Sequence, residues 1–117
     1  AFFLRMPFQP ARQLIDAGCA IAIASDFNPG SSPSGNMNLV VSMSCIGMKM
    51  LPEEAINAAT INGAYASFEE KSKGSIEVGK LADLVVLGRD PLREDPFSLI
   101  KIPVERTMVG GRWVFES

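Results

Sequence analysis

The sequence predicts an α/β fold in which a buried parallel strand lies between helices, followed by a small antiparallel sheet. Residues 19–25 (CAIAIAS) are apolar up to the final serine, whereas a strand with one wet face alternates polar and apolar residues. Residues 10–18, 39–50 and 52–64 show the apolar spacing of helices. Residues 104–115 form two β-rich runs around Gly110-Gly111. These observations favour an α/β protein that also carries a small β unit.

The first predicted helix extends from Pro10 to Gly18, with Leu14 and Ile15 on one face. Gly18 is expected to end it, because glycine readily adopts the left-handed conformation that follows many helices. Residues 2–6, before this helix, are interpreted as the end of a strand or a short edge. The apolar run that follows the helix is expected to be a strand covered on both faces.

A second helix is expected to begin near Asn36, after a loop over residues 27–38 that is rich in Pro, Gly, Ser and Asn. Either Ser34 or Asn36 can cap it, since a short polar side chain accepts hydrogen bonds from the first free N–H groups. The stretch from Leu39 to Met50 is apolar almost all round, which predicts burial on more than one side. Its methionines are interpreted as core residues.

A third helix is predicted to begin at Pro52, because proline is tolerated in the first helical turn. Glu53 and Glu54 then lie near the positive end of the helix dipole and are interpreted as solvated charges. Leu51 takes the N-cap position and cannot cap, which should cost about 1 kcal/mol relative to Ser or Thr. Asn62-Gly63 is interpreted as a weak point within or between helical segments.

Residues 75–117 are predicted to form a small antiparallel β unit. Its expected parts are a short strand and turn over residues 76–80, a strand over residues 84–87, and a hairpin whose two-residue turn is Gly110-Gly111. Asp83 is interpreted as a structural turn residue. The predicted domain organisation is therefore residues 1–74 for the α/β part and residues 75–117 for the β part.

Composition excludes several function classes. The net charge is −2 and the basic residues are scattered, which argues against a nucleic-acid partner. There is no run of about 18 apolar residues, so no membrane-spanning helix is expected. The chain contains no histidine, which excludes a Ser-His-Asp or Cys-His mechanism built within it. Cys19 and Cys45 are both expected to be buried free thiols, which favours a reducing, cytoplasmic setting.

Asp26 is the leading candidate for a functional residue because it directly follows the predicted buried strand. Functional sites of α/β barrels and sheets form at the carboxyl ends of their strands, where an aspartate can ligate a metal or act as a general base. Asn28, Gly30 and Ser31 in the next loop offer an amide, a close backbone approach and a hydroxyl. The alternative is that the same residues only form a turn.

The segment Ala22–Pro33 (AIASDFNPGSSP) resembles the Asp-x-Asn-Pro-Gly-Ser/Thr signature of the imidazolonepropionases, in the amidohydrolase superfamily. The following methionine-rich helix and residues 52–55 (PEEA) are similar to that family as well. Residues 74–87 (GSIEVGKLADLVVL) resemble a tail shared by the wider superfamily. The resemblance covers essentially the whole chain.

This resemblance implies that the chain is the C-terminal portion of a metal-dependent-hydrolase (β/α)8 barrel plus part of a small β-sandwich domain. The family hydrolyses a cyclic amide C–N bond, converting 4-imidazolone-5-propanoate to N-formimidoyl-L-glutamate in histidine degradation. It holds one Zn or Fe through three histidines and an aspartate. Asp26 matches that aspartate, with metal-binding and catalytic roles, and Asn28, Gly30 and Ser31 match substrate-binding positions.

The resemblance also implies a small-molecule substrate, a cytoplasmic location and a homodimer in the full-length enzyme. Because the metal-binding histidines of the family are not in this chain, the 117 residues alone are expected to be inactive. Two alternatives remain open. The chain could belong to another amidohydrolase, such as a cytosine-deaminase-like or prolidase-like enzyme, or it could be a non-catalytic binding or scaffold domain.

Overall fold

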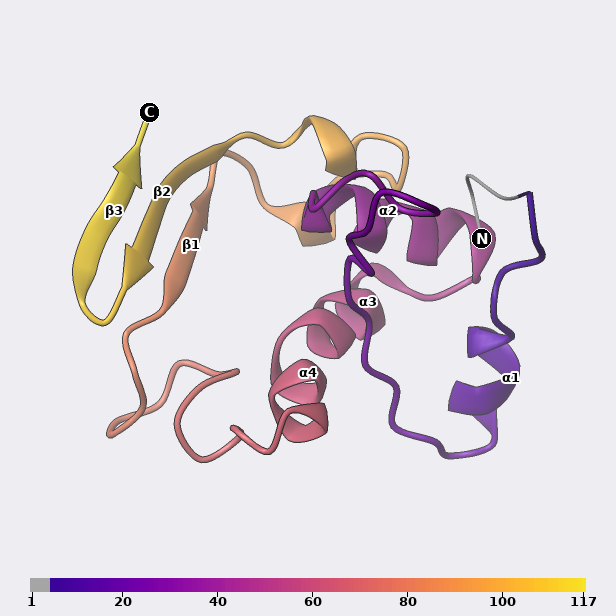
Figure 1. Cartoon of the computed structure of the whole chain (residues 1–117), viewed down its shortest axis with the longest axis horizontal. Helices are drawn as coiled ribbons and strands as arrows, with labels where there is room; N and C mark the ends of the chain where they lie inside the picture. The colour runs from indigo at the N-terminus through magenta and orange to yellow at the C-terminus, as the bar shows by residue number, and fades with distance from the viewer. Residues whose placement is uncertain (1–4) are drawn as a thin grey trace.

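A computed structural model describes residues 5–117, in which a group of helices precedes a three-stranded antiparallel sheet (Figure 1). The helices are α1 (Ala11–Asp16), α2 (Met37–Gly47), α3 (Pro52–Ala59) and α4 (Ile61–Ala66). The strands are β1 (Leu84–Leu87), β2 (Val104–Val109) and β3 (Arg112–Glu116), and the short 3-10 helices η1 (Pro91–Arg93) and η2 (Leu99–Lys101) lie between β1 and β2. The strand end predicted over residues 2–6 falls mostly outside the described residues, and its last two residues are not in a strand.

The ends of α1 and α2 confirm the sequence predictions. Gly18 follows α1 with a φ of 88°, the left-handed conformation that glycine adopts without strain. Asn36 caps α2, and its side chain accepts hydrogen bonds from the backbone N–H groups of Asn38 and Leu39. Both helix boundaries could therefore be predicted from single residues.

The start of α3 is also as predicted, and the helical region is interrupted just before Asn62-Gly63. Leu51 is the N-cap and makes no side-chain capping bond. The interruption between α3 and α4 is at Thr60, where φ is −117° and ψ is −90°. Asn62-Gly63 lies inside α4, so of the two positions predicted for the weak point, the one within a helical segment is found.

The prediction of a fully covered strand over residues 19–25 is wrong for the described structure. None of residues 5–117 pairs with this segment as a neighbouring strand, so the segment is extended chain outside any sheet. Its burial nevertheless alternates, with Ile21, Ile23 and Ser25 half-buried and the alanines between them exposed. This period of two is that of an extended chain covered on one side.

The sheet has the order β1-β2-β3, with antiparallel pairing throughout. Gly110 and Gly111 connect β2 to β3 with φ values of 58° and 81°, as a type I′ turn requires at both central positions. Asp83 accepts a hydrogen bond from the Gly110 N–H at 2.8 Å, which confirms its structural role. The strand predicted within residues 76–80 is absent, and that segment forms a turn only.

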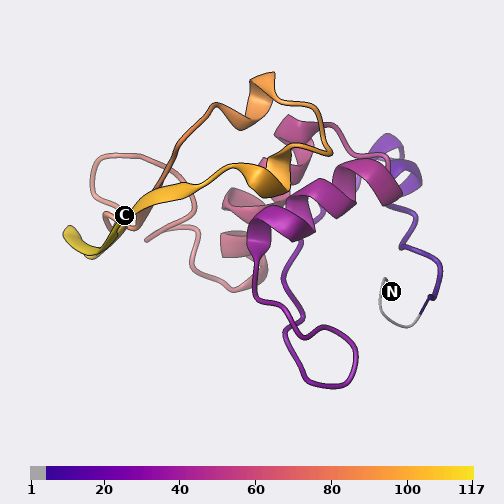
Figure 2. The same cartoon turned by 90° about the horizontal axis from the view of Figure 1, so that it is seen from above.

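The hydrophobic core lies among the helices and η2, to one side of the sheet (Figure 2). Its buried members are Ala11, Cys45, Met50, Ala55, Ala58, Leu99 and Ile102. Cys45 is buried as predicted, whereas Cys19 is exposed because it lies in the turn just after Gly18 rather than within a sheet. Among the described residues, no helix is long and apolar enough to cross a membrane.

Candidate functional site

A cleft of about 520 Å³ lies where α1, the segment over residues 21–26, the loop that follows it and α2 approach one another. Its polar lining comes largely from one stretch of chain, namely Ser25, Asp26, Ser31, Ser32 and Ser34. Its apolar lining comes mainly from Phe8, Leu14, Ile21, Ile23, Leu39, Val40, Met43 and Met48. The cleft therefore has a hydroxyl-rich and carboxylate-bearing part set against apolar walls.

Asp26 lines this cleft with an exposed side chain. Its φ of 50° is in the left-handed region, which aspartate tolerates better than most residues but which still requires local support. That support comes from Asn28, whose side-chain amide donates to the Asp26 backbone carbonyl at 2.7 Å. This bond engages the main chain of Asp26 rather than its carboxylate.

Asn28 organises the loop from within. Its Oδ1 accepts hydrogen bonds from the N–H groups of Gly30 and Ser31 at 2.9 and 2.8 Å, and its Nδ2 also donates to the Ser31 hydroxyl at 3.0 Å. Backbone bonds between Asn28 and Ser32 close the turn. A Cβ at Gly30 would lie 3.3 Å from Asn28 Oδ1, so the tight turn favours glycine there.

The four residues selected from the sequence thus divide into two pairs. Asp26 and Ser31 line the cleft, whereas Asn28 and Gly30 shape the loop without lining it. The hydrogen-bonded turn, which the sequence left open as the alternative to a functional site, is therefore present together with the cleft. The functional role of each of the four residues stays a prediction.

Sequence reasoning missed several cleft residues. Ser32 donates from its hydroxyl to the Ser25 carbonyl at 2.8 Å, which joins the loop to the segment before it. Met43 and Met48 line the cleft, Met48 also packs against the core, and Met50 is buried as expected. The high serine content of the loop was the sequence feature that could have identified Ser32. No local pattern distinguishes a methionine facing a cleft from one facing a core.

The described residues do not form a metal centre by themselves. Within residues 5–117 no three His, Cys, Asp or Glu side chains lie together as a metal-binding group, and the chain has no histidine. A protein zinc site uses three or four such ligands, so a single exposed carboxylate does not fit it alone. Asp26 by itself supplies only one of the ligands that such a site needs.

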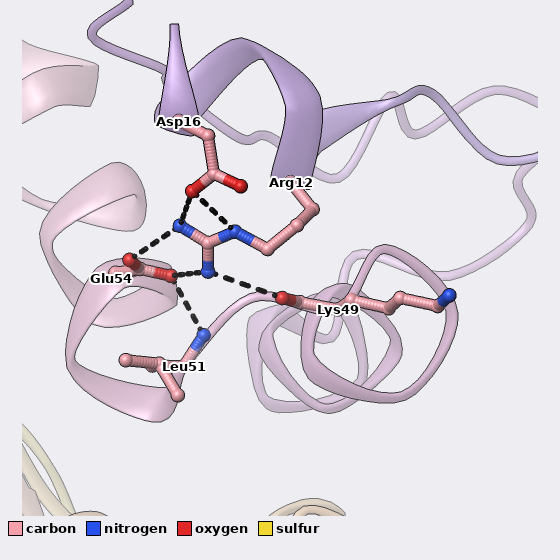
Figure 3. Close-up of polar contacts among 5 residues, drawn as sticks. All are labelled: Arg12, Asp16, Lys49, Leu51 and Glu54. Carbon is pink, nitrogen blue, oxygen red and sulfur yellow. Dashed lines mark hydrogen bonds and ion pairs between the residues drawn. The ribbon is translucent and has the colours of Figure 1, made fainter. Parts of the chain in front are cut away.

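Contacts from the helices place the segment that ends in Asp26. The Ile23 N–H donates to the Ala58 carbonyl of α3 at 3.1 Å, and the Asn62 side chain of α4 donates to the Ile21 carbonyl at 2.8 Å. Further back, Arg12 of α1 forms two parallel hydrogen bonds to Glu54 of α3 at 2.9 and 3.1 Å (Figure 3). Glu54 is thus ion-paired and half-buried rather than a freely solvated charge, which corrects the sequence interpretation.

Comparison with known proteins decides the family. The amidohydrolase family model matches residues 4–115. The chain belongs to the amidohydrolase family. Among its relatives, the imidazolonepropionase of Christiangramia forsetii is 58% identical over 91 residues, covering 78% of this chain and 22% of that protein. The imidazolonepropionase of Bacteroides fragilis is 47% identical over 111 residues, covering 95% of this chain and 27% of that protein.

These relatives confirm the resemblance to imidazolonepropionases that the Asp26 loop indicated. The chain spans about a quarter of the length of the curated relatives that it matches. Solved structures agree on the fold. An amidohydrolase from Thermotoga maritima superposes with a TM-score of 0.74 at 28% identity, covering 92% of this chain and 26% of that one. The ochratoxinase of A. niger gives a TM-score of 0.73 at 28% identity, covering 91% and 24%.

Proposed function

We propose that the whole protein hydrolyses a cyclic amide C–N bond, converting 4-imidazolone-5-propanoate to N-formimidoyl-L-glutamate in histidine degradation. The observation that carries this proposal is the loop from Asp26 to Ser31, which has the sequence DFNPGS and places an aspartate and a serine in one cleft. Relatives named imidazolonepropionase at 45% to 60% identity support the same substrate. The 117 residues alone are expected to be inactive.

The proposal includes a place for this chain in the whole enzyme. Residues 1–74 would form the last βα units of a (β/α)8 barrel, and residues 75–117 part of a small β-sandwich. Similarity to solved amidohydrolases and the antiparallel sheet at residues 84–116 support this assignment. In a barrel, neighbouring strands would cover the segment before Asp26, whose burial already alternates as in a strand.

In the proposed reaction Asp26 is the general base and then the general acid. Its carboxylate would take a proton from the attacking water and deliver it to the leaving ring nitrogen. The Ser31 hydroxyl, held by Asn28, would hydrogen-bond the substrate ring. A bound Zn or Fe would supply Lewis-acid polarisation, with Asp26 as one ligand and histidines from outside this chain as the others.

The remaining parts of the proposal concern partners and location. We expect a small-molecule substrate, a homodimer of the full-length enzyme, and neither a nucleic-acid nor a membrane partner. A cytoplasmic location agrees with the two free cysteines, one of which is exposed.

The test is turnover by the full-length, metal-loaded protein. Wild type should convert imidazolonepropanoate to formimidoyl-glutamate, measured by chromatography of the product. Asp26→Asn should lower kcat by about 100-fold or more, because a positioned acid–base group contributes at least that much. Asp83→Asn, which alters a carboxylate at the hairpin, is the matched control and should retain turnover.

A substrate panel separates the alternatives. Cytosine and proline-containing dipeptides should give little or no product if the proposal is right. Preferential turnover of either would assign the protein to another amidohydrolase branch. Absence of hydrolysis of every cyclic amide tested by the metal-loaded protein would contradict the proposed function.

A further inference from the structure

The chain segment that carries Asp26 is held in place mainly from one side. Within the described residues it pairs with no strand, and one backbone hydrogen bond links it to a helix, from the Ile23 N–H to the Ala58 carbonyl. Asn62 adds a second bond, since its Nδ2 donates to the Ile21 carbonyl at 2.8 Å. Both partners belong to α3 and α4, which run beside the segment (Figure 1).

The beginning of the segment is set by α1, which ends only a few residues before it. Arg12 of α1 binds Glu54 of α3 through two parallel hydrogen bonds, a geometry that fixes orientation as well as distance. The same guanidinium donates to the Asp16 carboxylate at 3.0 Å and reaches the Lys49 carbonyl at 3.4 Å (Figure 3). The pair therefore joins α1 to the start of α3.

Glu54 is itself held in one orientation. Its Oε2 accepts a hydrogen bond from the Leu51 backbone N–H at 2.9 Å, so the carboxylate is fixed to its own helix before it binds Arg12. The side chains of Arg12 and Glu54 are 31% and 24% exposed, which limits competition from water. The Arg12–Glu54 bonds and the Glu54–Leu51 bond together restrict the movement of α1 relative to α3.

None of Arg12, Glu54 and Asn62 lines the cleft. They reach the site only through the backbone of α1 and of residues 21–26, whereas the Ser31 hydroxyl is held by the Asn28 turn. The two sets of contacts meet at Asp26, because the Asn28 side chain also donates to the Asp26 carbonyl. Loss of the helix contacts would leave the Asp26 backbone held from the loop side alone.

We propose that Asn62 and the Arg12–Glu54 pair are positioning residues for Asp26. Through α1, α3 and α4 they fix the backbone before Asp26, and so the position of Asp26 at the cleft. The proposal rests on the proposed function for its kinetic consequence. A catalytic group displaced by about 1 Å can cost up to about 100-fold in rate. The apolar walls and Ser31 would still bind substrate, so the loss should appear in kcat more than in KM.

The test uses the full-length protein with Asn62→Ala and the control Asn57→Ala, which removes an exposed asparagine of α3. Asn62→Ala should lower kcat by about tenfold or more while KM changes less than about threefold. Asn57→Ala should match wild type. Equal kcat in the two variants, or a loss in Asn62→Ala explained entirely by a smaller folded fraction, would overturn the proposal.

The charge pair has its own test. Arg12→Ala and Glu54→Ala should each lower kcat, and the double variant should lose no more than either one, because partners in one interaction are not additive. Arg93→Ala, which removes a largely exposed arginine, is the matched control and should keep wild-type kcat. Additive losses from the two single variants would contradict a shared positioning role.

Hydrogen exchange separates this proposal from the proposed function. Amide exchange in residues 19–26 should be faster in Asn62→Ala than in Asn57→Ala, while exchange in β2 and β3 stays the same. This readout needs no substrate, so it decides the positioning role even if wild type hydrolyses no cyclic amide. Unchanged exchange in residues 19–26 would refute that role.

Discussion

Glu54 joins α1 to the start of α3 through one carboxylate. It accepts two hydrogen bonds from Arg12 of α1 and one from the Leu51 N–H at the start of its own helix. The Arg12 bonds, followed by the Leu51 bond, hold the pKa of Glu54 below its usual value of 4.5. Hydrogen bonds to Glu54 and then to Asp16 raise the pKa of Arg12, so it stays charged. The ion pair is therefore complete at neutral pH.

The lowered pKa of Glu54 makes part of the stability pH-dependent. Because the folded pKa lies below the unfolded one, the stabilisation is full above about 4.5 and is lost as pH falls through the folded value. Thermal unfolding of wild type and Glu54→Gln should show the larger Tm for wild type at pH 6–7, and the gap should close towards pH 3. Glu53→Gln is the control. A gap that widens on acidification would contradict the ion pair.

At the scale of elements, local capping and turn residues explain most boundaries. Asn36 begins α2, Gly18 follows α1, and Gly110-Gly111 turns β2 into β3. The start of α3 is the exception, since Leu51 offers no capping side chain. Glu54 compensates in part by accepting the Leu51 N–H, which is half of a capping box. The first N–H groups of α3 itself still lack a side-chain acceptor.

Replacing Leu51 should therefore stabilise the chain. Leu51→Ser would complete the capping box and raise the free energy of unfolding by about 1 kcal/mol, measured by urea denaturation. The leucine is 51% exposed, so little apolar burial is lost. Leu51→Ala is the control and should give no gain. A destabilised Leu51→Ser variant would show that packing of the leucine outweighs its missing cap.

The hairpin turn gives a second prediction at this scale. Gly110→Ala should lower the free energy of unfolding by about 1 kcal/mol, because an L side chain is strained at a φ of 58°. A Cβ there would meet no atom within 4 Å, so conformation is the only cause. Gly35→Ala is the matched control, with open space and no positive φ, and should change stability by less than about 0.5 kcal/mol. Equal losses would contradict the type I′ turn.

At the scale of the whole molecule, much apolar surface remains uncovered. Phe68 and Ile76 are 93% and 88% exposed, and every residue of β3 is exposed, including Trp113 and Phe115. Large exposed apolar patches mark interaction surfaces or lead to aggregation. The uncovered surface agrees with a chain that spans about a quarter of the length of its relatives.

The purified 117-residue chain is accordingly expected to self-associate. Size-exclusion chromatography with light scattering should give a mass that rises with concentration, because exposed apolar side chains leave water on association. Aspartate substitutions at Val114 and Phe115 of β3 should reduce this rise, whereas Asn57→Ala should not. A monodisperse monomer that unfolds cooperatively would favour the stand-alone binding domain.

Prediction from the sequence succeeded where interactions between neighbouring residues determine the local structure. Helix ends and the hairpin follow from side chains that bond their own backbone and from glycines that accept positive φ. The loop from Asp26 to Ser31 was readable for the same reason, since Asn28 bonds within its own turn. Composition excluded histidine from the candidate site, and the position of Asp26 directly after the apolar segment made its carboxylate the candidate.

Tertiary structure decided what distant residues do to one another. Arg12 and Glu54 are 42 positions apart, and neither carries a local sign of the other. Cys19 and residues 21–25 were expected to be buried in a sheet, yet burial depends on neighbours, and among the described residues helices rather than strands supply them. Local hydrogen bonds can be predicted from adjacent side chains, whereas burial and long-range pairing exist only after the chain has folded.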